Sequence, residues 1–228
     1  KNLKAVAARG TMDLEIARPM EALEYNKKFI DQITSAKVSQ TQGTLGTPFI
    51  WGATNSWGGV RTRNFQYNQC EYSDDIEPER IDEICEETMG PHHMTGCFGC
   101  QVHCRAQYKI PEGPYAGRYD EGPEYTSQGA FGGETDTPRA LTVLVGNHLV
   151  DQFGMDNLET GSLISWAMEL YELGIITDKQ TDGLDLSWGN DEAVIEMIER
   201  IAYRKGFLGD ALADGGIPAS KKIGQKSF

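Results

Sequence analysis

The sequence predicts a mainly α-helical fold, namely a helical domain interrupted by irregular loops. Apolar residues recur at helical spacing in five segments, and the stretches between them are rich in Gly, Thr and aromatic residues. Only residues 3–8, near the start, have the composition of a strand. We therefore expect helices to build the core and the long loops to bind ligands.

Length and charge narrow the class of protein. A chain of 228 residues, 39% hydrophobic and 24% charged, is typical of a globular protein with one large domain or two small ones. The formal net charge of −13 argues against nucleic acid as a partner. No run approaches the roughly 20 apolar residues that span a bilayer, and no signal peptide is visible, so we expect a cytoplasmic protein without a membrane span.

In the first half of the chain, the strand 3–8 is followed by one helix and one long loop. Pro19 suits the first turn of a helix, and apolar residues follow it at helical spacing: Leu23, Phe29, Ile30 and Ile33. Residues 43–68 have loop composition. Ile81, Ile84, Cys85 and Thr88 share one face of a further short helix, which makes Cys85 a packing residue.

In the second half, an irregular stretch over residues 111–133 precedes the main helices. These are expected at 138–152, 158–173 and 191–205, with a short turn near Lys179 and Gly206 as the C′ residue of the last helix. An apolar stripe on the last helix is expected to pack in the core: Val194, Met197, Ile198 and Ile201.

Three of the five cysteines fall within eight residues, as C-x2-C-x3-C: Cys97, Cys100 and Cys104. This spacing lets three thiolates converge on one inorganic cluster, and Gly96 and Gly99 permit the sharp turns that this needs. Such an array indicates a 4Fe–4S cluster in a reducing compartment, and a secreted disulfide framework does not fit it.

A zinc site is the alternative for this array. The three cysteines with His103 or His93 would make a tetrahedral Cys3His set, although structural zinc ligands usually come as two separated pairs. Either metal needs a fourth ligand, which is Cys70 or a residue outside this chain.

Several segments, in order along the chain, resemble the tungsten-dependent aldehyde ferredoxin oxidoreductase family. They are the cysteine array CFGCQVHC, the segment GPEY at 122–125, DQFGMD at 151–156, DGLDL at 182–186 with Trp188 and Gly189, the opening LKAVAARG at 3–10, and RTRNF at 61–65. The resemblance implies that residues 1–12 are the end of an N-terminal pterin-binding domain or a linker. It implies that residues 13–228 are the helical middle domain of a larger multidomain oxidoreductase.

The cofactors that the resemblance implies are a tungsten or molybdenum bis-pyranopterin, the 4Fe–4S cluster and a Mg ion. In the family, D-x-x-G-L-D contacts one pterin, so Asp151, Gly154, Met155 and Asp156 are the expected cofactor contacts, with Met155 in place of the usual Leu. Carboxylates can accept the N–H groups of a pterin ring, and Gly allows a close approach of the backbone.

Glu124 is the expected catalytic residue, and a structural carboxylate is the alternative. The family commonly has a second glutamate near the metal where this chain has Thr126, which leaves the type of reaction open. His148 lies on an apolar helix face and is expected to be a core residue, whereas His92 and His93 are expected at the surface.

By resemblance, the expected reaction oxidises an aldehyde to a carboxylate and passes electrons to ferredoxin or an iron–sulfur electron-transfer subunit, within an oligomer. The benzoyl-CoA reductases of the same family supply an alternative, the reduction of an aromatic acyl-CoA. A non-catalytic electron-transfer or zinc-stabilised interaction module is a third hypothesis.

Overall fold

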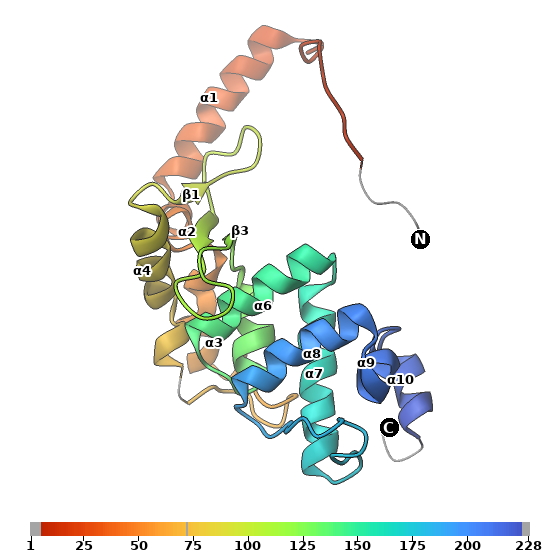
Figure 1. Ribbon diagram of the computed structural model, residues 1–228. Coiled ribbons are helices and arrows are strands. Elements are labelled where there is room, and N and C mark those ends of the chain that lie inside the picture. The colour runs from red at the N-terminus through yellow and green to blue at the C-terminus, as the bar shows by residue number, and fades with distance from the viewer. Residues whose placement is uncertain (1–5, 72, 225–228) are drawn as a thin grey trace.

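The computed structural model describes residues 6–71 and 73–224, and within them the fold is mainly α-helical, as the sequence predicts. The helices form an elongated body, from which the first helix projects at one end, while the last two helices lie at the other (Figure 1). Three short strands make the sheet that the described residues contain. No helix in the described part of the chain is long and apolar enough to cross a membrane.

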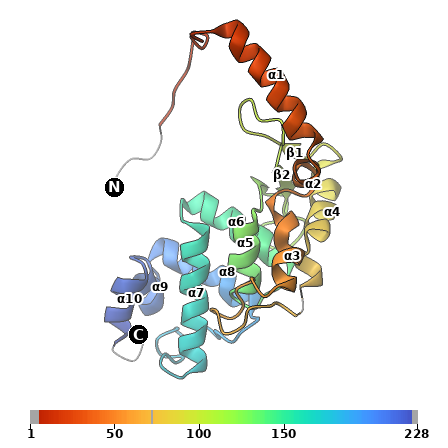
Figure 2. The same cartoon turned by 180° about the vertical axis from the view of Figure 1, so that it is seen from behind.

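The N-terminal segment differs from its prediction. The described part of the expected strand, residues 6–8, forms neither strand nor helix, and it has no neighbouring strand with which to pair; residues 3–5 lie outside the described residues. Helix α1 (Pro19–Ser35) begins at its proline as predicted. None of its residues is buried, and both views show it extending away from the body (Figures 1 and 2).

The long loop predicted over residues 43–68 is wrong in its first part. Helix α2 (Lys37–Leu45), the 3₁₀-helix η1 (Thr47–Ile50) and helix α3 (Trp51–Ser56) occupy it. These elements bury few side chains: α2 buries none, η1 buries Pro48, and α3 buries Trp51. Trp51 packs against a small cluster formed by Val60, Cys70, Ile76 and Val143. One anchor of this kind leaves no periodic signal in the sequence.

A small sheet carries the cysteine array. Helix α4 (Pro78–Met89) packs against the middle strand of β1 (Met94–Thr95), β2 (Arg105–Lys109) and β3 (Tyr119–Glu121), all antiparallel. Cys85 on α4 is fully buried in the main core, which confirms it as a packing residue, and burial raises the pKa of its thiol to about 12.

The stretch 111–133 is also more regular than predicted. It contains β3, helix α5 (Tyr125–Gln128) and a π-helical turn η3 (Gly129–Gly133). The glycines of η3 serve close packing here: a Cβ at Gly132 would lie 2.8 Å from Ile76 Cδ1, and one at Gly133 would lie 2.6 Å from a backbone oxygen. A glycine-rich sequence of this type has the composition of a loop, although the segment is buried.

Three helices form the centre of the body and confirm the predictions at 138–152, 158–173 and 191–205. They are α6 (Ala140–Phe153), α7 (Asn157–Glu172) and α8 (Asp191–Tyr203). Helix α6 packs against both of the others, and their apolar faces meet in the main core. The expected stripe on α8 is buried as predicted: Val194, Met197, Ile198 and Ile201.

The end of α8 corrects the prediction for Gly206, which is not its C′ residue. Arg204 takes the left-handed conformation there (φ 52°), and the Lys205 N–H donates to Arg200 O at 2.9 Å. Ion pairs to two aspartates, Asp210 and Asp214, hold the Arg204 side chain and offset the strain. The chain then continues into two helices that the sequence did not predict: α9 (Gly206–Leu212) and α10 (Gly216–Ile223).

The segment 61–65 turns sharply onto η3. Arg63, Asn64 and Phe65 all have positive φ (47°, 48° and 66°), a conformation that costs energy for residues other than glycine. The Asn64 N–H donates to Glu134 O at 3.2 Å, and Arg61 forms a 2.7 Å ion pair with the fully buried Glu134 carboxylate. These contacts fix the turn against the core.

A prediction about stability follows from Gly146 on α6. The ring of Phe131 lies so close that a Cβ at this position would be 2.7 Å from two of its ring carbons. Gly146→Ala is therefore expected to lower the free energy of unfolding by about 1–3 kcal/mol, because overpacking outweighs the gain in helix propensity.

Gly129→Ala is the matched control, since the site has helical φ and no atom within 4 Å of the added Cβ. It is expected to leave the stability unchanged or raised. Thermal and denaturant unfolding of the two variants checks this, and equal effects would contradict the packing described.

Candidate functional site

The three cysteines of the array lie on the loop that joins β1 to β2. Cys97 is exposed, Cys100 and Cys104 are half-buried, and the Cys100 N–H donates to Cys97 O at 3.0 Å, which closes the turn. Gly96 is required at its base, because a Cβ there would lie 2.6 Å from the ring of His103. The spacing read from the sequence thus corresponds to one tight loop.

The electrostatics of this loop act in opposite directions on two of its cysteines. Backbone N–H groups of Val102 and His103 donate to the Cys100 sulfur and lower the pKa of its thiol. Burial raises the pKa of Cys104, and the negative charges of Glu124, Cys100 and Cys97 raise it further. The sulfurs are therefore close enough to repel one another as thiolates, and a polynuclear iron cluster would neutralise this charge.

The alternative ligands lie elsewhere or are already engaged. Cys70 is buried in the apolar cluster around Trp51, and its backbone is hydrogen bonded to Asn55. His93 is buried, which corrects its expected surface position; its Nε2 lies 2.8 Å from Asp82 and its Nδ1 3.0 Å from Gly90 O. Among the described residues, no three His, Cys, Asp or Glu side chains are arranged to hold a single metal ion.

Glu124 lies beside the cysteine loop, at the start of α5. It is half-buried, and its carboxylate accepts a hydrogen bond from the Thr47 hydroxyl, which in turn accepts from Tyr125 N at 2.8 Å. The negative charge of Glu124 is among the causes that raise the pKa of Cys104. A carboxylate fixed next to the cysteine loop can exchange a proton there. The structure also gives Glu124 the hydrogen bond of a structural carboxylate.

The residues predicted to contact pterin form the corner between α6 and α7. Gly154 takes the left-handed conformation that ends α6 (φ 65°, ψ 39°), and the Met155 N–H donates to Val150 O at 2.9 Å. Asp156 caps α7, since its Oδ1 accepts from the Glu159 N–H at 2.8 Å. The motif therefore has a structural role of its own at this corner.

Asp151 opens onto the same corner. Although the residue is exposed overall, partial desolvation of its carboxyl raises its pKa, and the charge of Asp120 raises it further. His148 opposes this effect. It is 6% exposed, which confirms it as a core histidine, and its Nδ1 lies 2.7 Å from Asp120 Oδ2. The carboxylates of Asp151 and Asp156 can accept hydrogen bonds, as the N–H groups of a pterin ring would require.

Two residues of the site were missed by sequence reasoning. Asn147 on α6 is buried and joins the segments of the site: its Nδ2 donates to Glu121 O at 3.0 Å, and its Oδ1 accepts from Ser127 at 2.7 Å. The sequence could have indicated Asn147, because it is a polar residue within an otherwise apolar helix. The contact of Thr47 with Glu124 could not be predicted from local sequence, because the two residues are 77 positions apart in the chain.

Known proteins match this chain over nearly its whole length. A family model described as aldehyde ferredoxin oxidoreductase, domains 2 and 3, matches residues 24–228. A tungsten-containing aldehyde ferredoxin oxidoreductase of Thermococcus kodakarensis is 32% identical over 100% of this chain and 36% of its own length. An aliphatic sulfonate oxidoreductase subunit of Pyrococcus furiosus is 29% identical over 99% of this chain and 35% of its own length.

Among solved structures, the active-site complex of a benzoyl coenzyme A reductase with 1,5-dienoyl-CoA has a similar fold. The TM-score is 0.69 at 21% identity, over 96% of this chain and 33% of that one. This chain thus spans about a third of the length of the relatives it matches. It belongs to the aldehyde ferredoxin oxidoreductase family.

Proposed function

We propose that this chain is the helical middle part, residues 13–228, of a tungstopterin and iron–sulfur oxidoreductase that oxidises aldehydes to carboxylic acids, with residues 1–12 linking it to a pterin-binding domain. The observation that carries the proposal is the cysteine loop, where three thiols share one turn and two backbone N–H groups lower the pKa of Cys100. The membership in the family supports the same reading.

In this proposal Cys97, Cys100 and Cys104 hold three corners of a 4Fe–4S cluster. The fourth ligand comes from outside the described residues, because Cys70 is packed in the apolar cluster around Trp51. The cluster accepts single electrons and passes them to ferredoxin or to an iron–sulfur subunit in a cytoplasmic, oligomeric enzyme.

Asp151, Gly154, Met155 and Asp156 would hold one pterin of a tungsten or molybdenum bis-pyranopterin, together with a Mg ion that the resemblance implies. When bound, the pterin-held metal supplies the two-electron chemistry. The chain's contribution is to orient the cofactor: the left-handed Gly154 brings the backbone to the surface, and the two aspartates flank it.

Substitutions of Asp156 can separate its role as a helix cap from its proposed role in binding the pterin. Asp156→Ser keeps a side-chain oxygen for the helix cap, so stability should change little. The loss of the carboxylate should lower the affinity for pterin and tungsten by roughly 10- to 100-fold, the usual cost of losing a supporting contact.

Asp156→Ala is the comparison variant, and it should lose about 1 kcal/mol of stability as well as the cofactor. Metal analysis and thermal unfolding of the intact enzyme check both. If the serine variant keeps its full complement of tungsten and pterin, the assignment of this contact fails.

Thr126 keeps a second reaction open. Thr126, which stands where the family commonly has a glutamate, is exposed at the start of α5, and the solved structure of similar fold is that of a benzoyl coenzyme A reductase. The alternative is thus the reduction of an aromatic acyl-CoA.

Assays of the intact enzyme separate the two reactions. Aldehyde oxidation with an artificial one-electron acceptor, without reduction of benzoyl-CoA by a low-potential donor, is expected. Activity in the second assay alone would replace the proposed reaction with the alternative.

A further inference from the structure

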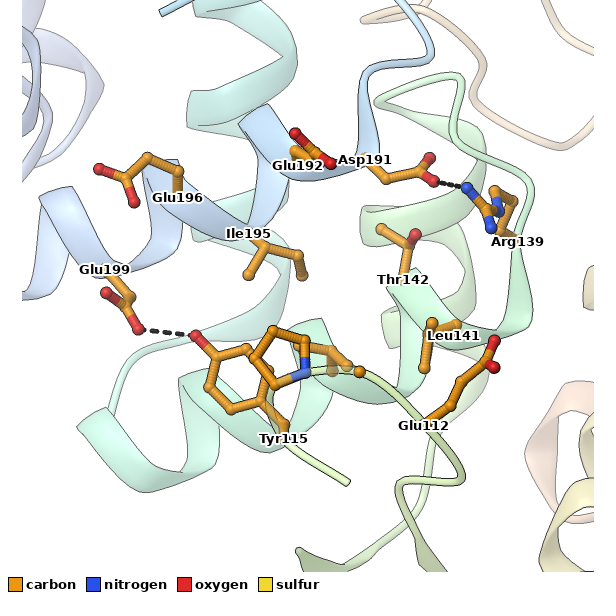
Figure 3. A pocket seen from close by; sticks show the side chains of 13 residues that line it. Glu112, Tyr115, Arg139, Leu141, Thr142, Asp191, Glu192, Ile195, Glu196 and Glu199 are labelled. Carbon is orange, nitrogen blue, oxygen red and sulfur yellow. Dashed lines mark hydrogen bonds and ion pairs between the residues drawn. The ribbon is translucent and has the colours of Figure 1, made fainter. Parts of the chain in front are cut away.

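A pocket away from the cysteine loop and the α6–α7 corner lies between α8, the first half of α6 and the loop that follows β2. Its volume is about 430 Å³, within the range of small-molecule sites. Figure 3 shows the acidic side chains of α8 on one side and Tyr115 with Leu141 on the other.

The floor of the pocket is apolar and preformed. Leu141, Val145 and Ile195 line it, and all three pack against the main core. The Tyr115 side chain is held across the floor, because its hydroxyl donates to Glu199 Oε1 at 2.7 Å (Figure 3). Burial of the Tyr115 hydroxyl, and next its interaction with Glu199, raise the pKa of this tyrosine to about 12. An aromatic ring and aliphatic walls held in this way can take an apolar ligand body.

The rim carries an excess of negative charge: five carboxylates and one guanidinium line the pocket. Asp191 is paired with Arg139, Glu196 with Arg200, and Glu199 accepts from Tyr115. The two remaining carboxylates, Glu112 and Glu192, have no partner within the described residues. A cation would find charge complementarity here, and the face of the Tyr115 ring would add to it.

Thr142 supplies a further polar group in the pocket. The residue is 3% exposed and lines the pocket, and its hydroxyl forms no hydrogen bond within the described part of the chain. It lies on α6 among the pocket side chains drawn in Figure 3. A hydroxyl can accept a hydrogen bond from an N–H group that enters the pocket.

We propose that this pocket binds an organic cation, an ammonium or guanidinium group on an apolar stem. The stem lies on Leu141, Val145 and Ile195, while the charged head meets Glu192 and Thr142. The chemistry is shared by a free alkylguanidine or amine and by a basic side chain of another polypeptide. The site uses none of the residues assigned to the cluster, to pterin or to the proposed catalysis, so it does not depend on the proposed reaction.

Calorimetric titration of the intact enzyme with agmatine, which carries a guanidinium and an ammonium group on one butyl stem, tests the proposal, with N-butylurea as a neutral compound with the same stem. Agmatine should bind at one site per chain, on the order of tenfold more tightly than N-butylurea, and its affinity should fall as salt is added. Glu192→Gln should weaken agmatine binding by about two- to fivefold, as expected for one partly exposed charge. Thr142→Val, which keeps the shape but removes the hydroxyl, should also weaken it.

Glu87→Gln is the charge-matched control, because Glu87 is an exposed residue of α4 and does not line the pocket. The Glu87→Gln variant should bind agmatine with the same affinity as the unsubstituted protein. Equal binding of agmatine and N-butylurea, or equal affinities of Glu192→Gln and Glu87→Gln, would overturn the proposal.

A third arm distinguishes the source of the cation. A capped Ala-Leu-Arg-Leu-Ala peptide that binds more tightly than agmatine, and depends on Glu192, assigns the pocket to a basic side chain of a partner. Tighter binding of agmatine assigns it to a free cation.

Discussion

Replacement of Cys100 by alanine in the intact enzyme is expected to abolish the iron–sulfur signal and to lower electron transfer to the acceptor by at least about 10²-fold, the upper end of what loss of a mere supporting contact costs. The Val102 and His103 N–H groups lower the pKa of the Cys100 thiol, whereas burial raises that of Cys104, so the thiolate of Cys100 forms more readily than that of Cys104. Electron paramagnetic resonance of the reduced protein and iron analysis measure the loss.

Two other cysteines provide matched controls. Cys70→Ala and Cys85→Ala remove buried thiols that pack in apolar clusters, so both should lose some stability yet keep the cluster. Loss of iron in the Cys70 variant with the fold intact would instead make Cys70 the fourth ligand. Retention of a normal cluster in the Cys100 variant would refute the assignment of the array.

Replacement of Glu124 by glutamine is expected to lower kcat by about 10²–10⁴-fold, the usual contribution of a positioned general acid or base. Oxidation of an aldehyde with water to a carboxylic acid releases two electrons and two protons. If the proposed reaction holds, the Glu124 carboxylate, which lies near Cys104 and accepts a hydrogen bond from the Thr47 hydroxyl, would take up one of these protons.

The glutamine variant separates catalysis from structure. Glutamine can still accept the hydrogen bond from Thr47 but cannot take up the proton, so iron and tungsten contents and thermal stability should stay normal. Thr47→Val should have a smaller effect, since it loosens the carboxylate without removing it. Glu87→Gln is the control for the charge. A fully active glutamine variant would leave Glu124 with the structural role that its hydrogen bond to Thr47 already provides.

Long periodic helices were predictable, and the reason is physical. Helices α6, α7 and α8 bury broad apolar faces in a single core, so burial and helical period coincide in the sequence. Pro19 and Pro78 stand at the first turns of α1 and α4, where a missing N–H costs nothing.

The short elements were not predictable from local pattern. In η3 and α6 glycine serves close approach: Gly146 lies against Phe131, and Gly132 against Ile76. A glycine that makes room for a side chain far away in the sequence cannot be told from a loop glycine by its sequence neighbours alone. Arg204 similarly ends α8 in place of a glycine, because two later aspartates hold its side chain.

The candidate site shows the same division. The cysteine array could be recognised in the sequence because its three cysteines lie within eight residues. The D-x-x-G-x-D segment could be recognised only through the family resemblance, because residues that end one helix and cap the next would look the same. The contact of Glu124 with Thr47 depends on the tertiary fold. Proximity of this kind leaves no local signal in a single sequence.

Quantitative analysis of iron, acid-labile sulfide and zinc in the anaerobically purified intact enzyme decides whether the cysteine array holds an iron–sulfur cluster. We expect about four iron atoms and four sulfides per polypeptide from this cluster, with no stoichiometric zinc. One zinc atom per polypeptide, with neither iron nor acid-labile sulfide, would contradict it.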